Sequence, residues 1–158
     1  MRAERFQIAH LDLFANYGGQ EPLVADLSRD ELAFLTEQRP GNHYSLWSGT
    51  RLMACMGVVG LNRFRGAAWA LLQRGSPSSF VGVHRLAYRL LRAQPYRRIE
   101  ATIDPTSWVA TRWMVMLGFR LEIAYRPYFF PDGRPAAEWA LYLEGEDNGS
   151  GLPVTGTE

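Results

Sequence analysis

Several features are missing from the sequence, and each absence excludes a class of protein. A single cysteine, Cys55, excludes an internal disulfide. The longest apolar run, Leu52 to Leu61, is interrupted by Gly57 and Gly60 and is too short to cross a bilayer of about 30 Å. The N-terminus shows no succession of basic, apolar and small residues of the kind that a signal peptide requires. We therefore expect a soluble, cytoplasmic protein that does not enter the membrane.

Lysine is absent as well, and acidic residues are missing from the middle of the chain. All 17 basic residues are arginine, and the 158 residues carry a net charge of +1. Residues 1–37 hold three arginines and seven acids, residues 38–99 hold ten arginines and no acid, and residues 100–158 hold four arginines and nine acids. The middle segment would attract the phosphates of a nucleotide or a nucleic acid, unless the fold interleaves it with the acidic segments.

Length and composition predict one globular domain. With 47% hydrophobic residues, a chain of this length buries one ordinary core. We assign residues 1–145 to that domain. Residues 146–158 are rich in Gly, Ser, Thr and acids, and we expect them to form a disordered tail.

Hydrophobic periodicity and turn signals predict an α/β fold. The expected elements are a strand at 6–14, a helix at 29–38 that starts in a Ser28–Glu31 capping box, a hairpin of strands 43–47 and 51–61, a strand at 67–73, a helix from 78 or 79 to about 94, a strand at 98–104, a helix with Asp104 as N-cap and Gly118 as C-cap, and a hairpin of strands 120–130 and 136–144. This order predicts a mixed, mostly antiparallel central sheet with flanking helices.

One segment carries a family resemblance. Residues 99–119 resemble the signature of the Gcn5-related N-acetyltransferases, with an alternating strand, a capped helix and Leu117-Gly118-Phe119 leading into the next strand. The order of elements agrees with that family along roughly residues 5–144. Arg112-Trp113 and the aromatic final hairpin look like the small acetyltransferase-like proteins that bacteriophages encode. The resemblance implies direct transfer of an acetyl group from acetyl-CoA to an amine of a small molecule or a protein.

The resemblance also implies where acetyl-CoA binds. In the family, the pantetheine arm lies where the strands corresponding to 67–73 and 98–104 separate, and the pyrophosphate binds where the former strand turns into a helix. The family has the motif Gln/Arg-x-x-Gly-x-Gly/Ala at this turn, and Pro77 stands in place of its first glycine. The alternative to a pyrophosphate site is a helix that starts with a Ser cap and binds no ligand. The implied contacts are the backbone of Ala70, Leu71 and Leu72, the turn residues Arg74, Gly75, Ser76, Ser78 and Ser79, and Ser107, which stands where the family commonly has Asn.

Three residues are candidates for proton transfer. Glu100 could deprotonate the incoming ammonium if apolar surroundings raise its pKa, or it could pair with a neighbouring arginine. Met114 stands where the family commonly has a Tyr that protonates the thiolate, and a thioether cannot donate a proton. Tyr125 and Tyr128 of the final hairpin could replace that acid, form a wall for the substrate, or belong to a protein interface.

Other reactive residue types have simpler interpretations. His43 and His84 have no second ligand at metal spacing, so we expect no metal site. Cys55 in an apolar strand is expected to be a buried hydrophobic residue rather than a nucleophile.

Two alternative functions stay open at this point. In the first, the fold is a catalytically weak or inactive module that binds a host or cellular protein, because Pro77, Ser107 and Met114 depart from the family and Tyr125, Tyr128, Phe129 and Phe130 are candidates for exposed aromatics. In the second, the arginine-rich segment binds nucleic acid. We do not expect the second, because only Arg85, Arg89 and Arg92 form a stripe and no recognition motif accompanies them.

Overall fold

The computed structural model describes residues 1–15, 29–38, 43–73, 77–130 and 132–143. Its elements are β1 (Arg2–Arg5), α1 (His10–Ala15), α2 (Arg29–Gln38), β2 (His43–Ser48), β3 (Arg51–Gly60), β4 (Arg65–Leu72), α3 (Pro77–Arg92), β5 (Arg98–Ile103), α4 (Trp108–Leu117), β6 (Arg120–Arg126) and β7 (Ala136–Tyr142). Ser28 and the Glu31 side chain, which would form the predicted capping box, and the predicted tail fall outside the described residues. No helix of the described ranges is long and apolar enough to span a membrane.

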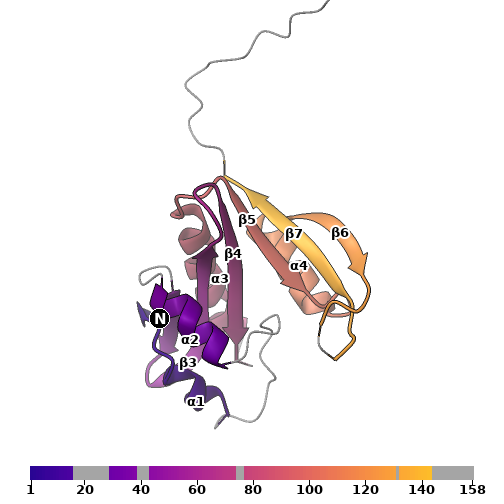
Figure 1. The fold of residues 1–158 in the computed structure, drawn as a ribbon. Helices are drawn as coiled ribbons and strands as arrows, with labels where there is room; N and C mark the ends of the chain where they lie inside the picture. Colours follow the sequence, from indigo (N-terminus) through magenta and orange to yellow (C-terminus); the bar gives the residue numbers. More distant parts are fainter. Residues whose placement is uncertain (16–28, 39–42, 74–76, 131, 144–158) are drawn as a thin grey trace, which may run out of the picture.

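The strands form one seven-stranded sheet in the order β1-β2-β3-β4-β5-β7-β6. Every neighbouring pair is antiparallel except β4 and β5, which are parallel. The structure thus confirms the predicted mixed, mostly antiparallel sheet. Figure 1 shows β4 and β5 meeting at one end and diverging toward the other.

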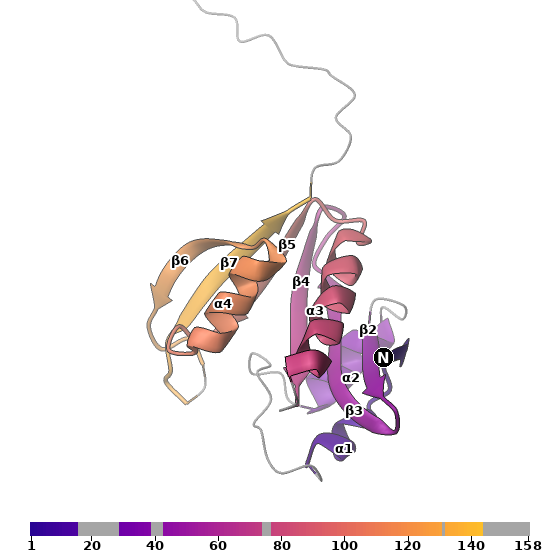
Figure 2. The same ribbon diagram turned by 180° about the vertical axis from the view of Figure 1, so that it is seen from behind.

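Helices cover both faces of the sheet. Figures 1 and 2 show α1 and α2 on one face and α3 and α4 on the other. The α3 helix buries Val83, Ala87 and Leu91, which recur every four residues, and it exposes Arg85 and Arg89. This amphipathic pattern places α3 on the sheet as the crossover between the parallel strands β4 and β5.

Each face of the sheet has its own core, because side chains along a strand alternate between faces. Ile99 and Ala101 of β5 pack with α3 and α4 in the larger core. Trp69 and Leu71 of β4 pack in the smaller core on the α1/α2 face, together with Cys55. Each side chain of β4 or β5 therefore packs on only one face of the sheet.

The predicted strand at 6–14 is wrong. The first strand is β1, in which Arg2 to Arg5 pair with Trp47 to Tyr44. Leu11 and Leu13, which gave the segment its strand-like alternation, pack from α1 against the smaller core. So short a segment satisfies the strand and the helix period about equally well.

The start of α4 also differs from the prediction. Ser107, and not Asp104, is the N-cap, and its side chain accepts a hydrogen bond from the Ala110 N–H (3.3 Å). The Asp104 carboxylate instead accepts from the N–H (2.8 Å) and the hydroxyl (2.7 Å) of Thr106, which delays the helix. The C-terminal prediction is confirmed, since Gly118 has φ 91° and the Phe119 N–H donates to the Met114 carbonyl (3.0 Å).

Candidate active site

The site begins where the ladder between β4 and β5 ends. Only three residue pairs join these strands, namely Arg65–Arg98, Gly66–Ile99 and Ala67–Glu100. Beyond them β4 continues to Leu72 along β3, and β5 continues to Ile103 along β7. The two strands therefore separate, and their later residues form no ladder with each other; we call this separation of the backbones the β4–β5 opening (Figure 2).

Backbone groups of β4 point into this opening at alternate residues. The Gln73 N–H donates to the Met53 carbonyl (2.9 Å), which marks a hydrogen-bonded pair between β4 and β3. Because bonded and non-bonded pairs alternate along an antiparallel ladder, the register bonds Leu71 to Cys55 and turns the backbone of Ala70 away from β3. Ala70 thus presents an amide to the opening, whereas the Leu71 amide belongs to the β3–β4 ladder.

The same alternation identifies a residue on the opposite side of the opening. The Leu143 N–H donates to the Arg97 carbonyl (2.8 Å), so the odd-numbered residues of β5 bond to β7. Thr102 therefore directs its backbone toward the β4 side. Sequence reasoning missed Thr102, because only the register of two distant strands reveals which amides face the opening.

Gln73 supplies a second feature that sequence reasoning missed. Its side-chain nitrogen and oxygen are both buried, and neither makes a hydrogen bond in the part of the chain that the structure describes. A buried amide without partners costs free energy, and because Gln73 directly follows β4, we take its side chain as a candidate contact for a ligand at this end of the strand.

Beyond Gln73, the predicted pyrophosphate contacts are partly outside the described residues. Arg74, Gly75, Ser76 and the Ser78 side chain are among these. Ser79 lies in the first turn of α3 and is half-buried. Pro77 is the first residue of α3, where a missing N–H breaks no helical bond. The N-terminus of this helix carries the partial positive charge that favours phosphate.

Glu100 stands at the last pair of the ladder and is held by two arginines. Arg65 donates to both of its carboxylate oxygens (2.9 Å each), and Arg98 Nε donates to Oε1 (2.8 Å). Burial raises the pKa of Glu100, but the hydrogen bonds from Arg98 and Arg65 outweigh it and hold the pKa below its ordinary value. The predicted rise in pKa is therefore wrong, and the alternative, that Glu100 pairs with an arginine, is confirmed.

The ion pairs continue from Arg98 across the neighbouring strands. Arg98 Nη1 donates to Glu122 (2.7 Å), and the Tyr142 hydroxyl also bonds to Glu122. The hydrogen bond from Arg98, supported by that of Tyr142, lowers the pKa of Glu122 to about 2. This network ties β5, β6 and β7 together beside the closed end of the opening.

The aromatic candidates of the final hairpin divide into exposed and buried residues. Tyr125 is 63% exposed, and Tyr128 is 87% exposed with a φ of 51°. Phe130 is buried, so it is not an exposed aromatic as predicted. Met114 is buried in the larger core, and the Ser107 oxygen is engaged as N-cap.

The remaining reactive side chains are buried or bonded to neighbours. Burial raises the pKa of the Cys55 thiol to about 12, against a smaller opposing effect of the hydrogen bond with Ser45. The indole N–H groups of Trp69 and Trp113 donate to Nδ1 of His43 (3.1 Å) and of His84 (3.3 Å). Cys55 is thus the buried hydrophobic residue that its sequence context predicted.

Solved structures share this fold. The chain superposes on Ard1 from Thermoplasma volcanium with a TM-score of 0.70 at 12% identity, covering 91% of this chain and 98% of that one. For a putative acetyltransferase from Salmonella typhimurium with its cofactor acetyl-CoA, the values are 0.68, 12%, 92% and 95%. For a Bacillus subtilis acetyltransferase in complex with CoA, they are 0.65, 16%, 90% and 99%.

These likenesses establish the fold. The sequence itself matches no protein-family model and no curated protein. The chain thus has the acyl-CoA N-acyltransferase fold of the Gcn5-related acetyltransferases, with the separated strands β4 and β5 at its centre.

Proposed function

We propose that the protein is an acetyl-CoA-dependent N-acetyltransferase that holds the coenzyme in the β4–β5 opening. The observation that carries this proposal is the ladder that ends after three pairs, because it leaves the backbone amide of Ala70 directed into an open edge. The fold shared with acetyltransferases solved with acetyl-CoA or CoA supports the same conclusion.

The residues at the opening fit the chemistry of the coenzyme. Its pantetheine arm carries amides, which match the backbone of Ala70 and Thr102 and the orphaned side-chain amide of Gln73. Its pyrophosphate matches the N-terminus of α3, where Ser79 and, by resemblance, Arg74, Gly75, Ser76 and Ser78 would bind it. When bound, the coenzyme supplies a thioester whose acetyl group passes to an amine.

The chain offers only a weak base for that transfer. Two arginines stabilise the ionised form of Glu100, so its affinity for a proton is lower than that of an ordinary carboxylate. Because its lowered pKa makes Glu100 a poor proton acceptor, we infer that the amine reacts from the fraction that is already neutral in solution. Tyr125 and Tyr128 remain our candidates for the acid, since both phenols are solvent-exposed.

Gln73→Leu tests this proposal without the ambiguity of a destabilised protein. Leucine removes two buried polar atoms that have no hydrogen-bond partner among the described residues, so the variant should unfold at a higher temperature than the parent. If Gln73 contacts the coenzyme, the same variant should bind acetyl-CoA about three- to tenfold more weakly in isothermal titration calorimetry.

Two results would count against the proposal. If millimolar acetyl-CoA gave neither binding heat nor thermal stabilisation, coenzyme binding would be excluded, since a ligand at 100 times its Kd stabilises the folded state by about 2.7 kcal/mol. Unchanged affinity in Gln73→Leu would exclude Gln73 from the site.

Loss of transfer in Tyr125→Phe or Tyr128→Phe, with coenzyme affinity retained, would identify the acid.

A second candidate function keeps the fold and loses the chemistry. Glu100 is occupied by arginines, and Met114 is buried where the family has an acid, so catalysis is weakened at two places. Tyr125, Tyr128 and Phe129 are exposed aromatics of the kind that anchor protein interfaces. In this function the hairpin would bind a cellular or host protein, and a Tyr128→Ala variant would lose a partner that the parent retains in a pull-down.

A further inference from the structure

The α4 helix is apolar on its outer side as well as on its inner side. The inner side buries Trp113, Met114 and Leu117 in the larger core. The outer side exposes large apolar side chains that recur at helical spacing, namely Trp108, Val109, Val115 and Met116. In soluble proteins, a helix that is hydrophobic all round is normally buried. The outer side of α4 is therefore an unpartnered apolar face in the part of the chain that the structure describes.

The neighbouring helix α3 adds positive charge to this face. The Trp113 indole of α4 donates to Nδ1 of His84 of α3 (3.3 Å), and Figure 2 shows both helices on the same face of the sheet. Neither helix contains an acidic residue. Three exposed arginines form no ion pair among the described residues, namely Arg85, Arg89 and Arg112. We call this area the α3/α4 surface, defined by Arg85, Arg89, Trp108, Arg112, Val115 and Met116.

The composition of the α3/α4 surface favours a protein as its partner. Tryptophan, methionine and arginine are enriched at protein interfaces, whereas surfaces that bind nucleic acid are more polar. The unpaired arginines require a partner that brings carboxylates. Two α3/α4 surfaces facing each other across a two-fold axis would bring cations together without any acid, so a symmetric contact of this kind is disfavoured.

The α2 helix carries the complementary charge on the opposite face of the sheet. Asp30, Phe34 and Glu37 are four and three residues apart, which places them on one side of the helix. All three are exposed, and the Phe34 side chain is 61% exposed. Asp30 and Glu37 form no ion pair among the described residues. An exposed aromatic ring thus lies between two acids that have no described cation beside them.

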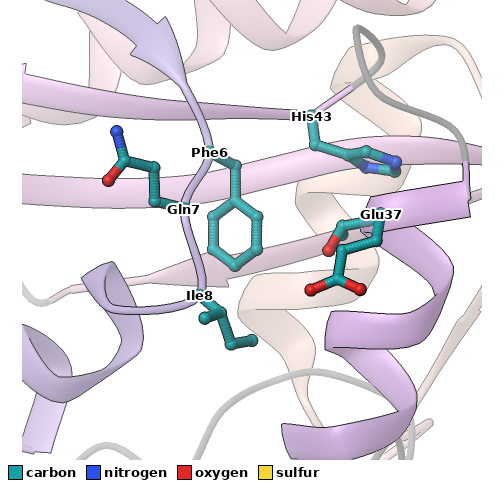
Figure 3. A pocket seen from close by; sticks show the side chains of 6 residues that line it. Phe6, Gln7, Ile8, Glu37 and His43 are labelled. Atoms are coloured by element: carbon teal, nitrogen blue, oxygen red, sulfur yellow. The ribbon is translucent and has the colours of Figure 1, made fainter.

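A pocket of about 290 Å³ adjoins this side of α2, and its described lining includes Phe6, Ile8, Glu37 and His43. Figure 3 shows the Phe6 ring between Ile8 and the side chains of Glu37 and His43. The pocket therefore combines apolar side chains with an exposed carboxylate, which suits an aromatic or arginine side chain of a partner. We call this area the α2 surface, defined by Phe6, Ile8, Asp30, Phe34 and Glu37.

We propose that the α3/α4 surface of one copy of this chain binds the α2 surface of a second copy. The exposed arginines would pair with Asp30 and Glu37, and Trp108, which is 70% exposed, would be the aromatic anchor that packs on Phe34 and the pocket. The two surfaces lie on opposite faces of one sheet (Figures 1 and 2), so each bound copy keeps one surface unused. The contact is therefore head-to-tail, and the assembly closes into a ring or continues to grow.

Sedimentation velocity of the full chain over a range of concentrations tests the proposal. At low salt, the average mass should rise with concentration and pass that of a dimer. Molar sodium chloride should weaken the association, because it screens the ion pairs. Trp108→Ala should weaken it by at least about tenfold, as the loss of an aromatic anchor does at other interfaces.

Mixing two variants tests the head-to-tail geometry. Trp108→Ala/Arg112→Gln impairs the α3/α4 surface and keeps the α2 surface, whereas Asp30→Asn/Glu37→Gln does the reverse. Each variant alone should stay a monomer at concentrations where the parent associates. The mixture should form a one-to-one complex that grows no further, because only one intact pair of surfaces is present.

Arg63→Gln/Phe64→Ala is the matched control, because it removes an exposed arginine and an exposed aromatic from the turn between β3 and β4. It should associate like the parent. A parent that stays a monomer at millimolar concentration would overturn the proposal, and so would a mixture of the two variants that stays monomeric. A monomeric parent that binds a single-stranded oligonucleotide, with affinity lost in Arg112→Gln, would assign the α3/α4 surface to nucleic acid and reject the proposal.

Discussion

At the scale of the residue, Cys55 shows how burial decides reactivity. Its side chain lies in the smaller core, and burial keeps the thiol protonated well above physiological pH. A thiolate is the form that attacks thioesters, so an acetyl group carried on Cys55 is not expected. In the proposed function, the acetyl group therefore passes directly from the coenzyme to the amine.

The raised pKa of Cys55 predicts a pH dependence of stability. The folded thiol titrates at about 12 and the unfolded thiol near 9.0, so between these values the unfolded state loses the proton first. Folding stability should therefore fall as pH rises through this window, by up to about 1.4 kcal/mol per pH unit. Urea unfolding of the parent and of Cys55→Ala measures it, and equal slopes above pH 9.0 in both proteins would contradict the assigned pKa.

Glu100 gives a second prediction of opposite sign. Its lowered pKa means that the ionised carboxylate stabilises the fold above its ordinary value of 4.5 and that this stabilisation is lost as pH falls below it. Glu100→Gln should cost about 1–2 kcal/mol at pH 7, because hydrogen bonds from Arg65 and Arg98 lose their charged acceptor. Chemical denaturation should show this difference shrinking in acid, and a constant difference from pH 7 down to strongly acidic pH would exclude the ion pairs as its source.

At the scale of the element, local patterns predicted most of the fold. The hairpin of β2 and β3 follows from two apolar runs and a turn in which Gly49 has φ 62°, and α3 follows from its helical spacing. The prediction for the β1–α1 segment was wrong because neither element is long enough to display a hydrophobic period. Asp104 failed as N-cap because a carboxylate can close a local turn with Thr106 equally well.

The site depended on pairings that local patterns do not contain. Arg98, two residues from Glu100, was a visible partner, whereas Arg65 reaches Glu100 from another strand 35 residues away. Likewise, only the register of β4 against β3 tells that Ala70 and not Leu71 faces the opening. The separation of β4 and β5 came from the family resemblance rather than from any feature of the two strands.

The surroundings of Gly66 indicate how tightly the closed end of the β4–β5 opening is packed. A Cβ at Gly66 would lie 2.6 Å from Val58 Cγ1 and 2.7 Å from Tyr96 Cδ2, and both neighbours are buried. Gly66→Ala should therefore destabilise the fold by about 1–3 kcal/mol through overpacking. Thermal unfolding should show a lower Tm.

Gly82→Ala is the matched control for that variant. Its added Cβ would meet only the side chain of Met1, which can move. Alanine is also a better helix former than glycine in the interior of α3. It should leave the Tm unchanged or raise it. If Gly66→Ala were as stable as Gly82→Ala, the close packing around the β4–β5 ladder would be wrong.

At the scale of the whole molecule, the segregated charges are partly neutralised by folding. Arg65 and Arg98 from the arginine-rich segment bond to Glu100 and Glu122 from the acidic one. Arg85 and Arg89 remain exposed on α3, the helix whose N-terminus follows β4. The interleaving interpretation therefore accounts for the cluster near Glu100, whereas Arg85 and Arg89 lie on the exposed side of α3.

The central claim is that the coenzyme binds along β4 in the β4–β5 opening, and amide hydrogen exchange of Ala70 tests it most directly. The Ala70 N–H points into the opening, whereas the Leu71 N–H is bonded within the β3–β4 ladder. In NMR exchange experiments, acetyl-CoA should slow Ala70 by at least about tenfold more than it slows Leu71, because it gives Ala70 a hydrogen-bond partner. Equal changes at both residues, or no change at Ala70 under saturating acetyl-CoA, would contradict the account.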